Sequence, residues 1–165
     1  MNVGSFITSE KETYGIFSDG YAQSVTDEFI FEYNSLRDVL EKDSLSLMYE
    51  NALGTSKLKH SKIQFLPPLI NPTKIICVGM NYRKPYPIDG QKVSDPNNII
   101  LFGKNREAML AHLDFLESPL GDASNSFDYE GEIAVVIGKQ ARNISPANAH
   151  EYIFGFSAFN DGSVR

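Results

Sequence analysis

Along the first part of the chain, apolar and polar positions alternate with the period of a β-strand. Short runs of this kind are VGSFI, TYGIF and YAQSV, within residues 3–25, and Ser18-Asp19-Gly20 has the composition of a turn. From Tyr33 to about Tyr49 the apolar spacing changes to that of a helix. The apolar residues of that segment, which we expect in the core, are Leu36, Val39, Leu40, Leu47 and Met48. The pattern predicts a small β-meander followed by one or two helices.

A cluster of prolines near residue 70 separates this region from the rest of the chain. Beyond it, KIICVG (74–79) and NIILFGK (98–104) are apolar runs typical of short buried strands, and residues 151–165 contain a further strand. Residues 107–118 predict either a helix or an irregular flap. The fold class is therefore α+β, mainly β, and we expect an N-terminal cap over residues 1–70 and a second domain over residues 71–165.

The alternation is clearest in FDYEGEIAVVIGK, residues 127–139. One side of this predicted strand carries Asp128, Glu130 and Glu132, and then turns apolar. Same-face neighbours on a strand lie about 7 Å apart, so two carboxylates could bind one cation between them. Without a cation the two carboxylates would repel each other. Because the far end of this strand is apolar on both faces, we expect that end to lie in a covered interior, with the acids at the entrance to it. The alternative is a solvated strand face without chemistry.

A third acid belongs to Asn160-Asp161, which ends the apolar run FGFSAF. Alone, this pair would be an ordinary turn. With Glu130 and Glu132, Asp161 completes a set of three carboxylates at strand ends, whose hard oxygens suit Mg²⁺, Mn²⁺ or Ca²⁺ better than zinc. Residues 79–83, directly after an apolar strand, are either a plain turn or polar groups facing a site.

Composition narrows the classes of function. The net charge is -6, and no stretch clusters Lys and Arg with aromatic residues, which argues against nucleic acid or anionic membranes as partners. No apolar run reaches the ~18 residues of a membrane span, and the opening residues lack a signal-peptide pattern, so we expect a cytoplasmic protein. Cys77 is the single cysteine, which excludes a disulfide framework and a CxxC metal site.

Two segments carry a resemblance to a known family. PPLINPTKIICVGMNY (67–82) and FDYEGEIAVVIGKQARNISPANAHEYIFGFSAFNDGSVR (127–165) resemble the fumarylacetoacetate hydrolase family, with its NPxKIICxGxNY, DYExELAVVIGKxARNxS and NDxSxR motifs. The beginning of the chain resembles the family's small N-terminal cap. The resemblance implies a mixed β-roll that usually forms a homodimer. It also implies a metal-dependent enzyme acting on 2-oxo acids or β-diketo acids, and its metal-binding carboxylates fall on Glu130, Glu132 and Asp161.

In such an enzyme the substrate chelates the ion, Mg²⁺ or else Mn²⁺ or Ca²⁺. The ion stabilises the enolate that the substrate forms. Carbon-carbon hydrolysis, decarboxylation, hydration or dehydration, and isomerisation can share that enolate. By resemblance, Lys104 is the lysine near the substrate, and Asn81 and Tyr82 are the NY pair of the entry strand, so these three are the catalytic candidates. Arg83 and Lys84 are candidates for binding a substrate carboxylate.

The sequence departs from the family pattern at two places. Pro85 stands where family members carry a water-activating His, and of the three histidines only His112 is a candidate replacement. Family members also continue beyond the NDxSxR strand, so we expect this chain to hold a roll that is truncated at the C-terminus. The alternative function is therefore a catalytically impaired or truncated family member that keeps the fold and can keep metal binding. A purely structural or interaction domain is a third possibility.

Overall fold

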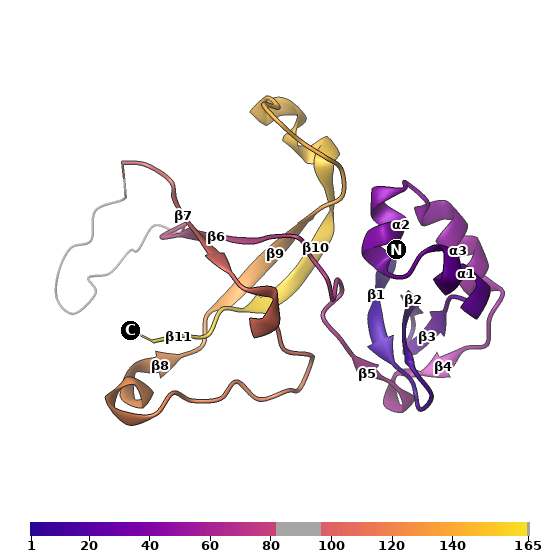
Figure 1. The fold of residues 1–165 in the computed structure, drawn as a ribbon, viewed down its shortest axis with the longest axis horizontal. Coiled ribbons are helices and arrows are strands. Elements are labelled where there is room, and N and C mark those ends of the chain that lie inside the picture. Colours follow the sequence, from indigo (N-terminus) through magenta and orange to yellow (C-terminus); the bar gives the residue numbers. More distant parts are fainter. Residues whose placement is uncertain (82–96, 165) are drawn as a thin grey trace. The chain divides into compact units, whose positions relative to one another are not determined.

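The computed structural model describes residues 1–81 and 97–164 and divides the chain into two compact units. One unit comprises Met1–Ile70 and Leu110–Arg165, and the other comprises Asn71–Met109. Strands dominate both units, as the ribbon in Figure 1 shows, so the α+β, mainly β fold class is confirmed. Within the described ranges, no helix has the length and apolar character needed to cross a membrane. The predicted division into residues 1–70 and 71–165 stays a prediction.

The N-terminal residues form a five-stranded antiparallel sheet in the order β4-β3-β2-β1-β5. Its strands are β1 (Asn2–Ile7), β2 (Glu12–Ser18), β3 (Tyr21–Ser24), β4 (Leu58–Lys59) and β5 (Gln64–Phe65). The predicted meander is thus confirmed. Asp19 and Gly20 connect β2 to β3 with φ angles of 43° and 82°, the positive values that a tight two-residue hairpin turn requires.

Three short helices follow the meander: α1 (Asp27–Glu32), α2 (Leu36–Glu41) and α3 (Leu45–Leu53). The sequence predicted one or two helices from Tyr33 to about Tyr49, and α2 and α3 confirm this, whereas α1 lies before that range and was not predicted. Side chains cap the first two helices, whereas Ser44 before α3 makes no side-chain cap hydrogen bond. Thr26 accepts a hydrogen bond from the Phe29 N–H at the start of α1, and Ser35 does the same for Asp38 at the start of α2.

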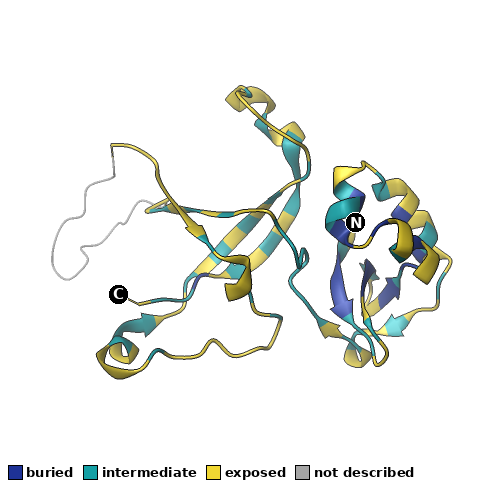
Figure 2. Cartoon of the chain, viewed as in Figure 1, coloured by how far each residue is buried: buried dark blue, intermediate teal, exposed yellow. Residues whose placement is uncertain are grey.

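The main hydrophobic core lies between this sheet and its helices, in the dark blue region of Figure 2. Leu36, Val39 and Met48 are buried there, as predicted. Leu40 is half-buried, and the prediction for Leu47 is wrong, because its side chain is 53% exposed. In α3 the residues four apart that reach the core are Met48 and Ala52, which leaves the neighbouring Leu47 on another side of the helix.

The C-terminal residues form two antiparallel ladders. The longer one pairs β9 (Gly131–Ile137) with β10 (Ile153–Asn160), and the shorter one pairs β8 (Phe127–Asp128) with β11 (Ser163–Val164). Short 3₁₀ helices at Gly121–Ser126 and Pro146–Tyr152 precede β8 and β10. The strand predicted over residues 127–139 is therefore present in two pieces, with an interruption at the acidic residues.

In the unit Asn71–Met109, residues 71–81 and 97–109 contain one antiparallel pair, β6 (Ile75–Gly79) with β7 (Ile100–Lys104). Both strands were predicted, but the prediction that they are buried is wrong: Ile76 is 60% and Leu101 is 61% exposed. A two-stranded ladder has two faces and supplies no second layer of its own. A 3₁₀ turn at Arg106–Ala108 follows β7. The stretch 109–118 lacks a helix, which decides between the two predictions for residues 107–118 in favour of the irregular flap.

Candidate functional site

Glu130 lies opposite Asp161 at the junction of the two C-terminal ladders. Asn160 pairs with Gly131 at the end of one ladder, and Ser163 pairs with Asp128 in the next, in the same register. The intervening residues therefore face each other in continuation of that register. The backbone N–H of Asp161 donates to the carbonyl oxygen of Glu130 at 2.8 Å, which fixes this pairing directly.

Two side chains take part in the backbone bonding at this point. The Glu130 N–H donates to Oδ1 of Asn160 at 3.1 Å, and Oγ of Ser163 donates to the carbonyl of Asp161 at 3.0 Å. Sequence reasoning missed both roles. The available signal was the pair of short polar residues flanking Asp161 in NDGS, since such side chains readily bond to nearby backbone groups.

The acids share one face of the ladder. Glu132 lies opposite Phe159, and directly opposed residues of an antiparallel pair project to the same side. Glu130 and Glu132 are half-buried, and Asp161 is 5% exposed. Backbone pairing and strand alternation therefore place all three predicted carboxylates at one end of one face.

The opposite face of β9 is apolar and open. Ile133, Val135 and Ile137 are 63%, 48% and 58% exposed. The prediction that the apolar end of this strand enters a covered interior is therefore wrong for the face of β9 that carries Ile133, Val135 and Ile137. The half-buried residues Ala134 and Val136 belong to the face that carries the acids.

The chemistry of the donor set fits a hard divalent cation, because it consists of carboxylates and one of them is buried. Burial of a carboxylate costs free energy unless opposite charge or hydrogen bonds compensate it. Across residues 1–81 and 97–164, however, no three His, Cys, Asp or Glu side chains stand where they could hold one ion. The backbone pairing puts the acids on one face, while their side chains as described do not surround a single ion position.

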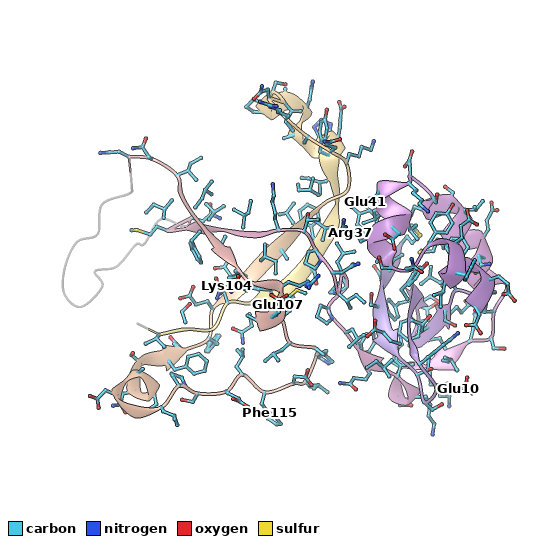
Figure 3. All side chains as sticks on the ribbon, viewed as in Figure 1. Glu10, Arg37, Glu41, Lys104, Glu107 and Phe115 are labelled. Carbon is cyan, nitrogen blue, oxygen red and sulfur yellow. The ribbon has the colours of Figure 1, made fainter. Side chains whose placement is uncertain are left out.

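The other described candidates lie in the unit Asn71–Met109. Lys104, labelled in Figure 3, ends β7 and is half-buried. It pairs with Ile75, whereas Gly79, two residues before Asn81, pairs with Ile100. Lys104 and Gly79 thus lie at opposite ends of the β6–β7 ladder, about 13 Å apart along the strands, and Asn81 follows two residues after Gly79. Tyr82, Arg83, Lys84 and Pro85 fall outside the described residues.

His112, the histidine considered as a replacement for the missing base, has a packing role. Its backbone N–H donates to the Phe65 carbonyl at 3.3 Å, and its ring meets the Phe65 ring edge to face, with centroids 5.9 Å apart. The backbone bond and the ring contact with Phe65 account for the presence of His112 without a catalytic role.

Comparison with known proteins identifies the class to which this fold and site belong. The family profile described as fumarylacetoacetate (FAA) hydrolase C-terminal matches residues 74–165, more than half of the chain. The chain therefore belongs to the fumarylacetoacetate hydrolase family. Among solved structures, a fumarylacetoacetate hydrolase from Exiguobacterium antarcticum matches with a TM-score of 0.71 and 26% identity, over 99% of this chain and 56% of that one. The two C-terminal ladders fit a part of the family's β-roll.

A second solved structure supports the fold alone. A 5-carboxymethyl-2-hydroxymuconate delta-isomerase from Mycobacterium smegmatis matches with a TM-score of 0.68 and 22% identity, over 100% of this chain and 55% of that one. Both solved structures therefore match along nearly the whole chain.

Two curated relatives carry the name oxaloacetate tautomerase. The YisK protein of Bacillus subtilis is 31% identical over 84% of this chain and 44% of its own length. The mitochondrial fahd2 protein of Xenopus laevis is 35% identical over 72% of this chain and 39% of its own length. The chain spans less than half the length of these relatives. Their family includes hydrolases, isomerases and tautomerases, and it acts on small-molecule acids with divalent metals.

Proposed function

We propose that the chain carries part of a divalent-metal-dependent active site for enolate chemistry on a small 2-oxo acid, specifically its enol–keto interconversion. The observation that supports this proposal most directly is the backbone pairing of Glu130 with Asp161, on the face that also bears Glu132. The two relatives named as oxaloacetate tautomerases support this reaction and a substrate of the oxaloacetate kind. In this proposal residues 1–70 are the cap, residues 71–165 belong to the β-roll, and the protein works as a homodimer.

Glu130, Glu132 and Asp161 would hold the cation, Mg²⁺ or else Mn²⁺ or Ca²⁺. When bound, a divalent cation would polarise the 2-oxo group of the substrate and stabilise the negative charge that develops on its oxygen. Lys104 is proposed to transfer a proton, and Asn81 and Tyr82 to orient the substrate. Arg83 and Lys84 are proposed to bind its carboxylate. Because Asn81 follows the end of the ladder that lies away from Lys104, we assign the two residues different roles.

Tautomerisation also agrees with Pro85. Hydrolysis of a carbon-carbon bond needs an activated water, and the family's water-activating His is replaced by Pro85 in this sequence. Enol–keto interconversion moves a proton between carbon and oxygen and consumes no water. Decarboxylation and isomerisation need no activated water either, so Pro85 argues against hydrolysis and hydration, and the two named relatives favour tautomerisation among the rest.

The test is the decay of the enol absorbance of oxaloacetate in the presence of Mg²⁺ or Mn²⁺, corrected for the metal-only rate. We expect the chain to accelerate the decay, and Glu130→Gln and Glu132→Gln to lower this acceleration by at least about tenfold. Glu117→Gln, at an exposed position, is the control and should match the wild type. Equal rates in all variants would remove the acids from the site, and a folded wild type without acceleration would refute the tautomerase assignment.

A second candidate is a family member that keeps the fold without turnover. The observation that favours it is that, in the part of the chain the structure describes, no three potential ligands stand in position for one ion. The same assay separates the two candidates when it is paired with a metal-binding measurement. Metal binding without acceleration would support this second candidate.

A further inference from the structure

We propose that Asn160 is a positioning residue for Glu130, an inference that rests on the proposed metal site. Asn160 was recognised in the sequence only as half of a turn-like Asn-Asp pair. In the structure its side-chain oxygen accepts the backbone N–H of Glu130 at 3.1 Å. Its own backbone lies opposite Gly131, one position along the ladder. Asn160 therefore bonds diagonally across the strand pair to the residue before its own partner.

This diagonal bond uses the backbone N–H of Glu130, which in a regular ladder would donate to a backbone carbonyl of the opposite strand. In a regular antiparallel pair, the two opposed residues of a hydrogen-bonded position exchange both N–H to carbonyl bonds. Here the Asp161 N–H to Glu130 carbonyl bond is present, while the Glu130 N–H and the Asp161 carbonyl each have a side-chain partner, Asn160 and Ser163. The strand assignments stop on both sides of this pair, between Asp128 and Gly131 and between Asn160 and Ser163.

The arrangement ties the two acids together while the ladder is interrupted. Glu130 is held through its carbonyl by Asp161 and through its N–H by Asn160, so both of its backbone polar groups are bonded across the pair. An interrupted ladder without these bonds would leave the Glu130 backbone free to rotate, and its carboxylate would move with it. Groups that orient metal ligands typically change metal affinity by about 10- to 100-fold when they are removed.

The experiment uses the full chain and the variants Asn160→Ala and Asn160→Asp, with Asn148→Ala as the control at an exposed asparagine. Hydrogen exchange of the Glu130 amide, measured by NMR without metal, reports the bond itself. Calorimetric titration with Mn²⁺ then reports its effect on the ligand. We expect Asn160→Ala to speed Glu130 exchange by at least about tenfold and to weaken Mn²⁺ binding by about tenfold. Asn160→Asp keeps the acceptor oxygen and should keep the amide protected.

The outcomes separate this inference from the proposed function. Unchanged Glu130 exchange in Asn160→Ala overturns the inference, and so does faster exchange with unchanged Mn²⁺ affinity. If the wild type binds no Mn²⁺, the metal site itself is refuted and the role of Asn160 falls with it. If Asn160→Ala does not fold, Asn160→Gln makes the same test, because the extra methylene shifts the amide oxygen away from the Glu130 N–H.

Discussion

The carbonyl of Glu130 accepts the backbone N–H of Asp161 at 2.8 Å, although 31 positions separate the two residues in the numbering. This bond lies where the β9–β10 ladder gives way to the β8–β11 ladder. It explains how acids from two distant motifs meet on one face. It also makes the two motifs interdependent, since a change at either end alters the position of the other.

Lys104 provides a prediction about catalysis. Lys104→Ala should lower kcat/KM for enol–keto interconversion of a 2-oxo acid by about a hundredfold, because the proposed proton donor is lost. The melting temperature should stay close to that of Lys74→Ala, a control at an exposed lysine in the same unit. Steady-state kinetics and thermal unfolding of both variants make the comparison. Equal kcat/KM values would remove Lys104 from the active site.

Met48 and Leu47 provide a matched pair for the core of the N-terminal sheet. Met48 is 0% and Leu47 is 53% exposed. Met48→Ala should lower the free energy of unfolding by about 2–5 kcal/mol, because it leaves a cavity. Leu47→Ala should change it by about 0.5 kcal/mol or less. Urea denaturation followed by circular dichroism measures both values, and similar losses in the two variants would contradict the assigned face of α3.

Tyr14 gives the N-terminal core a pH dependence. Burial, with smaller contributions from Asp38 and Tyr33, raises the pKa of the Tyr14 phenol well above its usual range. The hydroxyl donates to the Tyr33 carbonyl. Because the unfolded chain loses this proton at lower pH than the folded chain, the associated stability is complete below about pH 10 and falls as the pH rises further.

Tyr14→Phe should therefore cost about 1–3 kcal/mol at neutral pH, since the Tyr33 carbonyl loses its buried donor. Above about pH 10 the difference from the wild type should shrink. Urea denaturation across this range measures the difference, with Tyr49→Phe, at a 39% exposed position, as the control. A difference that stays constant with pH would show that Tyr14 does not contribute in this way.

Gly15 is required by the close approach of β2 to β3. A Cβ at this position would lie 2.0 Å from the carbonyl oxygen of Gln23, and the clash is with backbone that cannot move aside easily. Gly15→Ala should lower the free energy of unfolding by about 3 kcal/mol or more. Gly155→Ala, where nothing lies within 4 Å, is the control and should be tolerated. Equal stabilities of the two variants would contradict the described pairing.

Sequence alone was sufficient for most of the longer strands, because alternation with period two is a local property. It located β1 to β3, β6, β7 and the acidic strand, and it named the family. It did not predict α1, which lies before the segment with helical apolar spacing, and it left open whether that segment holds one helix or two. It placed Leu47 in the core because neighbouring apolar residues of a short helix cannot be assigned to faces without the sheet.

Burial was the less predictable property. Apolar runs such as Ile75–Gly79 indicate strands that some layer usually covers, yet Ile76 and Ile133 are largely exposed in this chain. The roles of Asn160 and Ser163 were also out of reach, because they depend on a register between residues far apart in sequence. A turn-like Asn-Asp pair carries no local sign that its first member bonds to the backbone of Glu130.

The most direct test of the metal site is the thermal stability of the chain titrated with Mg²⁺ and Mn²⁺, alone and with oxalate as a mimic of a 2-oxo acid enolate. A ligand that binds only the folded state raises the melting temperature, by an amount that grows with the logarithm of its concentration relative to Kd. We predict a metal-dependent rise that oxalate enlarges, and its loss in Glu130→Gln and Glu132→Gln but not in Glu117→Gln. A folded wild type without any rise, or the same rise in all variants, would contradict a metal site at Glu130, Glu132 and Asp161.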